Sequence, residues 1–322
     1  MADVLHVQVI VPSRRRHETL ELVEPHPATS HVVLMADAAR QPVGDVIAFD
    51  VAREASNEIL TMLEALDLGD QGAIVVSHTE LVISAQAEQA QARAPGDPAD
   101  SVIWDEVEVT LDEAAAISPP YLAFFVVAAI IGAAGVLTDS PVLIVGAMVV
   151  GPEYAPVAAC AFGLHRHNGH LVRRGAWCFV VGATIAVGTA TVVAVLVRAT
   201  GQVPDPYSSG EMVMTDFIAH PDALSAAVAA AAAVAGMLAL AQGRAGPLVG
   251  VLISVTTLPA IAAIGVGVAF TDRSEIIGAA GQLGVNLACL AGFGVGTLAV
   301  LGRLSPDPSP RRFPSPRLGS FR

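Results

Sequence analysis

An acidic residue lies in the middle of a long apolar run of this sequence. Residues 141–164 are almost entirely apolar, with Glu153 near the centre and Pro152 and Pro156 close to it on either side. A helix needs about 20 residues to span the hydrocarbon core of a bilayer, so the run is long enough to cross it. A charge there costs roughly 2.5–3.5 kcal/mol on insertion scales, and prolines interrupt the helical hydrogen bonds. The run therefore predicts a broken transmembrane helix whose carboxylate binds an ion or a solute.

The second part of the chain is apolar enough to form a membrane domain. The whole sequence is 53% hydrophobic and 15% charged, which excludes an ordinary soluble domain. After Pro120 the apolar residues fall into six segments of near-spanning length, which predicts an all-α six-helix transmembrane domain. These segments are 121–138, 141–164, 175–198, 222–242, 247–270 and 280–302.

The arginines indicate the orientation of these helices, because cytoplasmic loops are enriched in basic residues. The connection 165–174 is basic, Arg244 lies between the fourth and fifth segments, and the chain after residue 302 is rich in arginine. The connection between the third and fourth segments has acidic residues and no arginine. An even number of spans puts both termini on the same side of the membrane, and the basic connections indicate that this side is the cytoplasm. We therefore predict a multi-pass protein of the cell membrane with both termini in the cytoplasm.

The first part of the chain has the pattern of a mixed α/β domain. Four strand patterns and two helical patterns follow one another in the order βαββαβ. That order is typical of a ferredoxin-like fold, so the expected fold class is α+β, with this domain preceding the transmembrane helices. The expected strands are 3–12, 31–36, 44–52 and 72–83, and the expected helices are 14–24 and 53–66.

Composition divides the chain into four parts. The ferredoxin-like domain is expected over residues 1–84, and a linker with an acidic, partly amphipathic segment over 85–118. The transmembrane domain then extends over 119–303. The remaining residues 304–322 are rich in Pro, Ser and Arg, which predicts a disordered cytoplasmic tail.

The two halves of the membrane domain resemble each other after a shift of 104 residues, which pairs Gly163 with Gly267. The same shift brings together two interrupted helices, at Pro152–Pro156 and Ser254–Pro259. With three helices in each half, the second half starts on the opposite side of the membrane and is therefore inverted. This predicts an inverted 3+3 repeat of the kind found in transporters. The alternative is chance pairing in a sequence rich in Gly and Ala.

Charge and cysteine content limit the partners. Residues 1–120 carry a net charge of −15 and residues 121–322 a net charge of +2, so an acidic soluble domain gives no reason to expect nucleic-acid binding. The three cysteines lie in apolar runs, which indicates buried thiols and no disulfide framework. We expect no cofactor. The expected partners are the lipid bilayer, further copies of the chain, and a small molecule or ion.

Polar residues at the interrupted helices are the candidate site. Glu153 is interpreted as a proton or cation site, or alternatively as a neutral carboxyl buried in a helix interface. The Asp-Ser-Pro sequence that starts at Asp139 either lines a solute path or simply starts a helix. The hydroxyls of the second interruption either face the path or bond to helix carbonyls, and Asn286 either lines the path or joins two helices. The expected path residues are Asp139, Ser140, Pro141, Pro152, Glu153, Tyr154, Pro156, Ser254, Thr256, Thr257, Pro259 and Asn286.

Signals for catalysis and for metal binding are weak. The sequence has no Gly-x-Ser-x-Gly, no His-Glu-x-x-His and no phosphate loop, so we expect no enzyme. His165, His167 and His170 are close in sequence, but no cysteine or carboxylate nearby completes a metal site, which favours a solvated basic loop.

Several short motifs together resemble one known family. The motifs in the membrane part are Asp139-Ser140-Pro141, Val145-Gly146-Ala147-Met148, the prolines 152 and 156, Ser254 to Pro259, and Asn286; those in the soluble part are Gly44-Asp45-Val46, Asp50-Val51 and Asn57. Across about residues 4–300 the chain is similar to the bacterial and archaeal domain of unknown function 389 family. The resemblance implies a multi-pass membrane protein with a cytoplasmic N-terminal domain, and no settled activity.

Two departures from the family pattern stand out. Glu153 and Tyr154 occupy positions where apolar residues are expected, and Pro259 stands alone where a proline pair is common. The carboxylate is therefore interpreted as a specialisation of this chain. The function that we predict is a transporter or channel for a small solute or ion, with a regulatory or oligomerisation domain in the cytoplasm. The alternative is a membrane-embedded sensor or scaffold, and a lipid-modifying enzyme is a weaker third reading.

Overall fold

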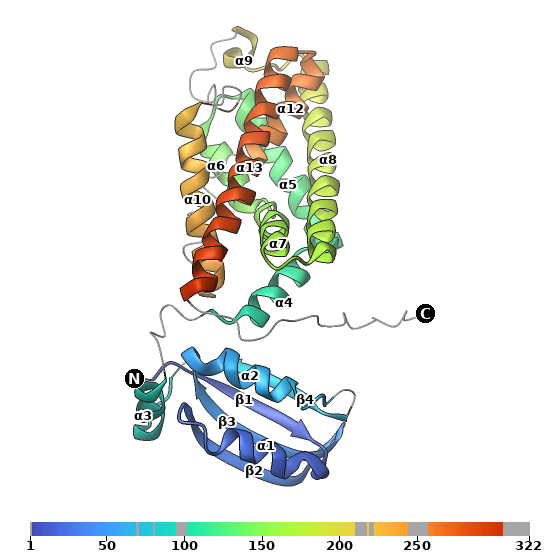
Figure 1. Cartoon of the computed structure of the whole chain (residues 1–322). Helices are drawn as coiled ribbons and strands as arrows, with labels where there is room; N and C mark the ends of the chain where they lie inside the picture. The colour runs from blue at the N-terminus through green and yellow to red at the C-terminus, as the bar shows by residue number, and fades with distance from the viewer. Residues whose placement is uncertain are drawn as a thin grey trace. The chain divides into compact units, whose positions relative to one another are not determined.

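The protein consists of two compact units, which are described one at a time. The computed structural model describes residues 2–68, 71–79, 81–94, 102–209, 218, 222–243 and 257–304 (Figure 1). One unit comprises Met1–Trp104 together with Leu301–Arg322, and the other comprises Asp105–Val300. The predicted tail lies outside the described residues from residue 305 onward.

The N-terminal unit contains a four-stranded antiparallel sheet, which confirms the α+β class. The strands lie in the order β2-β3-β1-β4, so the first and third strands are neighbours at the centre. In that central pair Val4 lies opposite Ala52 and Val11 opposite Asp45. The elements are β1 (Val4–Val11), α1 (Arg16–Val23), β2 (Thr29–Arg40), β3 (Val43–Ala52), α2 (Ser56–Glu64) and β4 (Ala73–His78).

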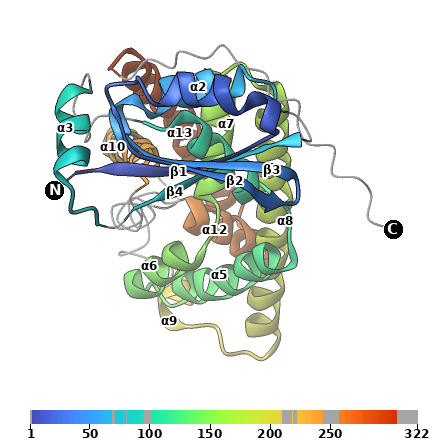
Figure 2. The same cartoon turned by 90° about the horizontal axis from the view of Figure 1, so that it is seen from below.

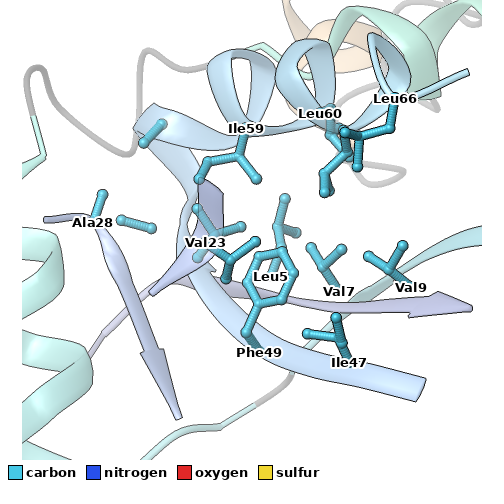
Figure 3. Close-up of a cluster of buried hydrophobic side chains, with 14 of the residues drawn as sticks. Leu5, Val7, Val9, Val23, Ala28, Ile47, Phe49, Ile59, Leu60 and Leu66 are labelled. Atoms are coloured by element: carbon cyan, nitrogen blue, oxygen red, sulfur yellow. The ribbon is translucent and has the colours of Figure 1, made fainter. Parts of the chain in front are cut away.

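One face of this sheet carries the hydrophobic core. Alternate residues of a strand face the same side, so Leu5, Val7 and Val9 of β1 point together into the core. They meet Ile47 and Phe49 of β3 and the apolar side chains of α1 and α2 (Figure 3). Figure 2 shows α2 lying over this side of the sheet. The apolar face of α2 and the apolar faces of β1 and β3 thus form one core.

A buried carboxylate in this unit is fully paired. The side chain of Asp45 is inaccessible to solvent and accepts two hydrogen bonds from the guanidinium of Arg16, from Nε at 2.7 Å and from Nη2 at 2.9 Å. The backbone N–H of Asp37 donates to the same carboxylate at 2.7 Å. The Arg16 guanidinium therefore lowers the pKa of Asp45 to about 2.

Part of the expected linker is helical. Helix α3 (Ala85–Arg93) begins after Ser84, whose Oγ accepts from the backbone N–H groups of Gln86 and Ala87 as an N-cap. A second short helix, α4 (Trp104–Ala114), follows in the acidic segment. The first residue of α4, Trp104, is 2% exposed.

The second unit is a bundle of apolar helices, as expected for a membrane protein. Among the described residues, four helices are long and apolar enough to cross a bilayer, and a pair bent by 56° raises this number to five if the pair is one span. The fifth predicted segment, 247–270, is described only as a helix of 14 residues, because residues 244–256 lie outside the described residues. The helices are α5 (Pro119–Leu137), α6 (Pro141–Val150), α7 (Tyr154–His165), α8 (Gly169–Ala199), α9 (Asp205–Ser209), α10 (Ala223–Ala241), α12 (Thr257–Phe270) and α13 (Arg273–Leu304).

The outward faces of these helices are apolar. Phe124, Trp177 and Ile277 are exposed by 52%, 63% and 71% of their surfaces. In water such surfaces would be unfavourable, because burying apolar area stabilises by about 25 cal/mol per Å². Lipid tails satisfy them, so the described helices have the surface of a membrane-embedded bundle.

Three connections between helices have the same tight turn. Asp139, His167 and Thr271 adopt positive φ angles of 50°, 57° and 63° after α5, α7 and α12. In each turn the next backbone N–H donates to a carbonyl five residues earlier, which is the Schellman pattern of a helix end. The bonds are Ser140 N–H to Gly135 O (2.9 Å), Asn168 N–H to Gly163 O (2.8 Å) and Asp272 N–H to Gly267 O (2.9 Å).

The helix bounds repeat along the chain. Helix α5 begins at Pro119 and α10 at Ala223, 104 residues later, and both have 19 residues. Helices α8 and α13 begin at the same separation and have 31 and 32 residues. Their N-caps also correspond, since Ser118 and Asp222 each accept from the backbone N–H three residues on. The colours in Figure 1 show that the chain runs upward in α8 and downward in α13.

Candidate functional site

The bent pair α6–α7 contains the predicted interruption. Gly151, Pro152 and Glu153 separate the two helices, and the axes differ by 56°. Pro152 cannot donate a hydrogen bond into α6, and Pro156 is the third residue of α7, where a missing donor costs nothing. The two prolines therefore end one helix and permit the next to start.

Glu153 lies at this break, buried in the bundle. Glu153 is 3% exposed, and its carboxyl lies close to its own backbone and to that of Leu258 in α12. Its second oxygen, Oε2, has no hydrogen-bond partner. A buried polar atom without a partner costs about 1–3 kcal/mol, more when it is charged. Within the described parts of the six predicted membrane segments, Glu153 is the only acidic or basic side chain away from the segment ends.

Gly151 leaves room for this carboxyl. A Cβ at position 151 would overlap Glu153 Oε2 and would lie 3.0 Å from Leu258 Cδ2. The carboxyl therefore folds back over the backbone of the break, between Gly151 and the start of α12. Any larger residue at position 151 would displace it.

Tyr154 follows Glu153 and points toward another helix. A Cβ at Gly236 of α10 would overlap the Tyr154 hydroxyl and lie 2.7 Å from Cζ, so the ring packs directly on the α10 backbone. The hydroxyl is buried and has no hydrogen-bond partner. The break thus carries two neighbouring polar side chains that are buried and incompletely bonded.

The second predicted interruption meets the first through Leu258, which follows Thr257. Thr257 is 1% exposed, its Oγ1 has no hydrogen-bond partner, and Leu258 beside it contacts the Glu153 carboxyl. Pro259 is the third described residue of α12, as Pro156 is of α7. Ser254 and Thr256 lie outside the described residues.

The Asp-Ser-Pro sequence lies away from this centre. Asp139 and Ser140 form the turn between α5 and α6, and Pro141 is the first residue of α6. The ten residues of α6 separate this turn from Gly151, a distance of about 15 Å at 1.5 Å per residue. The geometry is that of a helix end followed by a helix start, which explains these three residues without a ligand.

Asn286 has a neighbour that the sequence did not suggest. Gln282, one turn earlier on α13, donates from Nε2 to Asn286 Oδ1 at 3.3 Å, and both side chains are 1% exposed. The i, i+4 spacing could have revealed this pair, because residues four apart share a helix face.

Charged groups that form pairs lie at the helix ends. Asp112 of α4 pairs with Arg174 near the start of α8 at 2.7 Å, and Glu108 accepts from Asn168 at 3.0 Å. At the opposite end of α8, Arg198 donates to the carbonyl of Ala269 at 2.9 Å. Glu153 differs from these groups, because it forms no ion pair with the described residues.

Comparison with known proteins supports one family. Residues 148–291 match a family model described as "Domain of unknown function (DUF389)", which confirms the predicted resemblance. The matched region contains the break, Thr257 and Asn286, whereas the Asp-Ser-Pro turn precedes it. No curated protein and no solved structure matches the chain.

Proposed function

We propose that this member of the domain of unknown function 389 family is an integral membrane transporter or channel for a small solute or ion. The observation that carries the proposal is Glu153, a buried carboxyl with an unpaired oxygen at a break between two apolar helices. An acid in a membrane helix is costly to insert, and such acids usually belong to ion or solute pathways. Broken helices near the bilayer centre supply the backbone groups of such pathways.

The topology that fits this function has six spans in two inverted halves. The repeated helix bounds, the repeated turns and the opposite directions of α8 and α13 support it. Three crossings per half make the second copy run the opposite way, and the broken helix α6–α7 then corresponds to the region that ends in α12. The basic connections support a cell-membrane topology in which both termini are cytoplasmic.

The N-terminal unit is proposed to be a ferredoxin-like domain that regulates the membrane part or joins copies of the chain. The strand order β2-β3-β1-β4 and the order of helices and strands support that fold. The edge strands β2 and β4 expose apolar side chains, among them Leu34, Met35 and Val75. Exposed apolar residues on a sheet edge are suited to pairing with another copy.

Flux through liposomes that contain the purified full-length protein tests the transport proposal. The probes are protons, sodium, potassium, chloride, nitrate and glycerol, each compared with protein-free liposomes. We expect flux of at least one probe, changed at least about tenfold by Glu153→Gln, which is the effect of losing about 1.4 kcal/mol of interaction. Glu113→Gln is the matched control, because Glu113 is an exposed acid on α4.

The alternative, a membrane-embedded sensor or scaffold, predicts a different result. Background flux for every probe, with a folded protein of unchanged oligomeric state, would contradict transport and favour the scaffold. The exposed residues of β2 and β4 would then mark the signalling surface, and Met35→Lys would change the oligomer mass without affecting the helices.

A further inference from the structure

The repeat assigns Glu153 a counterpart. The separation of 104 residues that relates α5 to α10 and α8 to α13 also relates Glu153 to Thr257. Glu153 is the N-cap of α7, and Thr257 is the first described residue of α12. The two halves of the bundle therefore present equivalent polar residues at equivalent helix starts.

Glu153 meets the residue that follows its counterpart. The Glu153 carboxyl, at the start of α7, lies against Leu258, in the first turn of the described part of α12. Pro259 supports this placement of Leu258, because a proline is tolerated in a first turn but not in a helix interior. Two helix starts thus lie against one carboxyl.

Helix starts carry positive charge. Each is equivalent to roughly half an elementary charge, so two starts supply about +1. An ionised Glu153 supplies −1 and balances them, whereas a protonated Glu153 leaves about +1 uncompensated. The carboxylate therefore occupies a position where any small anion would be stabilised.

An unpaired hydroxyl beside Leu258 indicates a further donor. Thr257 precedes Leu258, its Oγ1 is buried and has no hydrogen-bond partner, and a hydroxyl can donate to an anion. Thr257 is 1% exposed. With the unpaired Oε2 of Glu153, it supplies an observation independent of the helix starts.

We propose that Glu153 is a tethered anion that exchanges places with a small monovalent anion. In the resting state the ionised carboxylate lies against the starts of α7 and α12. When a proton from the aqueous phase binds to the carboxylate, the −1 charge is lost and an anion takes its position, so proton and anion enter together with no net charge. This assignment rests on the proposed transport function and names its substrate class.

No other described group around Glu153 is a carboxylate that could supply the negative charge and bind the proton. Tyr121 of α5 lies within electrostatic range of Glu153, and its hydroxyl donates to the carbonyl of Cys178 of α8 at 3.0 Å. Tyr154 and Cys160 are the other titratable groups on α7 before His165, and Cys289 lies on α13. These groups are phenols and thiols, and the described residues of α6, α10 and α12 contain no titratable side chain.

Anion binding to the purified full-length protein in detergent tests the proposal without requiring transport. The probes are chloride, nitrate, formate and acetate, and the readout is the shift in melting temperature with anion concentration, between about pH 5 and about pH 8. For wild type we expect an affinity that falls about tenfold per pH unit once Glu153 ionises, because one proton is bound with each anion. Glu153→Gln imitates the protonated acid, so it should bind the same anion with an affinity that does not depend on pH.

Two further variants complete the design. Thr257→Val removes the counterpart hydroxyl while keeping the shape, and should weaken binding about tenfold in both wild type and Glu153→Gln. Glu113→Gln should match wild type throughout. Folding is checked in each case by the melting temperature without added anion.

The outcomes separate this inference from the proposed function. If Glu153→Gln is folded and binds none of the four anions, or binds with the pH dependence of wild type, the tethered-anion proposal is wrong. Flux of a cation that is lost in Glu153→Gln would then preserve transport while overturning the anion assignment. Anion binding as described, with no flux of any probe, would preserve the site and contradict transport.

Discussion

The two units treat a buried carboxylate in opposite ways. Asp45 in the N-terminal sheet is inaccessible to solvent and is paired by Arg16 and by the Asp37 N–H. Glu153 in the membrane unit is equally buried, has no basic partner among the described residues, and leaves Oε2 unbonded. A buried carboxylate with all its hydrogen-bond partners stabilises a fold. A buried carboxylate that lacks a partner lowers the stability, and we interpret such a group at a helix break as functional. The comparison separates a structural acid from a functional one.

The largest expected difference is in stability. Asp45→Ala leaves the Arg16 guanidinium without its partner and should destabilise the N-terminal unit by about 2–4 kcal/mol. Hydrogen exchange of the β1 and β3 amides in the full-length protein measures this as a loss of protection of roughly 30- to 1000-fold. Glu153→Gln should change the stability of the membrane unit by less than about 1 kcal/mol, because it removes no pair. Equal losses for the two variants would remove the distinction.

The acid dependence of the N-terminal unit should follow Asp45. Its pKa is lowered from 3.8 to about 2 by Arg16, so the folded state binds the proton less readily than the unfolded state. The pair therefore stabilises fully above about pH 4, and that contribution is lost as the pH falls toward 2. Protection factors of the β1 amides measured down the pH scale should show this loss in wild type and lack it in Asp45→Asn. Identical profiles would contradict the assignment.

A smaller effect should couple Gly151 to Glu153. The Cβ of Gly151→Ala would overlap Glu153 Oε2, so the substitution should destabilise the membrane unit by about 1–3 kcal/mol. In a Glu153→Ala background part of this cost should disappear, giving a coupling of about 1 kcal/mol in a double-mutant cycle of thermal unfolding. Gly188→Ala is the matched control, since nothing lies within 4 Å of a Cβ there. Additive effects of the first two substitutions would show that the carboxyl does not lie over Gly151.

The smallest effect concerns the amide pair on α13. Gln282→Leu removes the donor to Asn286 and should destabilise by about 0.6 kcal/mol, a typical value for a polar contact between membrane helices. Anion affinity and flux should be unchanged, because this pair makes its hydrogen bond on its own helix. A change in either property, measured as above, would place Asn286 in the path.

The outline of the molecule could be predicted because strong local patterns determine it. Alternating residues predicted β1, and long apolar runs predicted α5 and α10 close to their observed bounds. Apolar runs also predicted α8 and α13, which begin six and seven residues earlier than expected because their first turns are polar. Prolines predicted the break before Tyr154, because proline cannot donate to the preceding helix. The helix α3 was missed, because a Gln- and Ala-rich stretch before Pro and Gly resembles a linker, and its start depends on one cap from Ser84.

The composition of the site was less predictable, because it depends on contacts between distant segments. The sequence indicated Glu153 and Thr257 separately, but only the fold brings Leu258 against the Glu153 carboxyl. Asp139 also had two compatible interpretations; its positive φ is that of a helix end, and its place in a solute path stays a prediction. Gly236 gave no sign that it accommodates the Tyr154 ring.

Proton uptake on anion binding is the most direct measurement of the central claim, that the unpaired Glu153 carboxylate exchanges its charge with a ligand. The purified full-length protein in weakly buffered detergent solution is titrated with the anion that stabilises it, above the pH at which Glu153 ionises. The account predicts an uptake approaching one proton per anion for wild type and none for Glu153→Gln. Equal uptake by the two proteins, or binding by wild type without uptake, would contradict it.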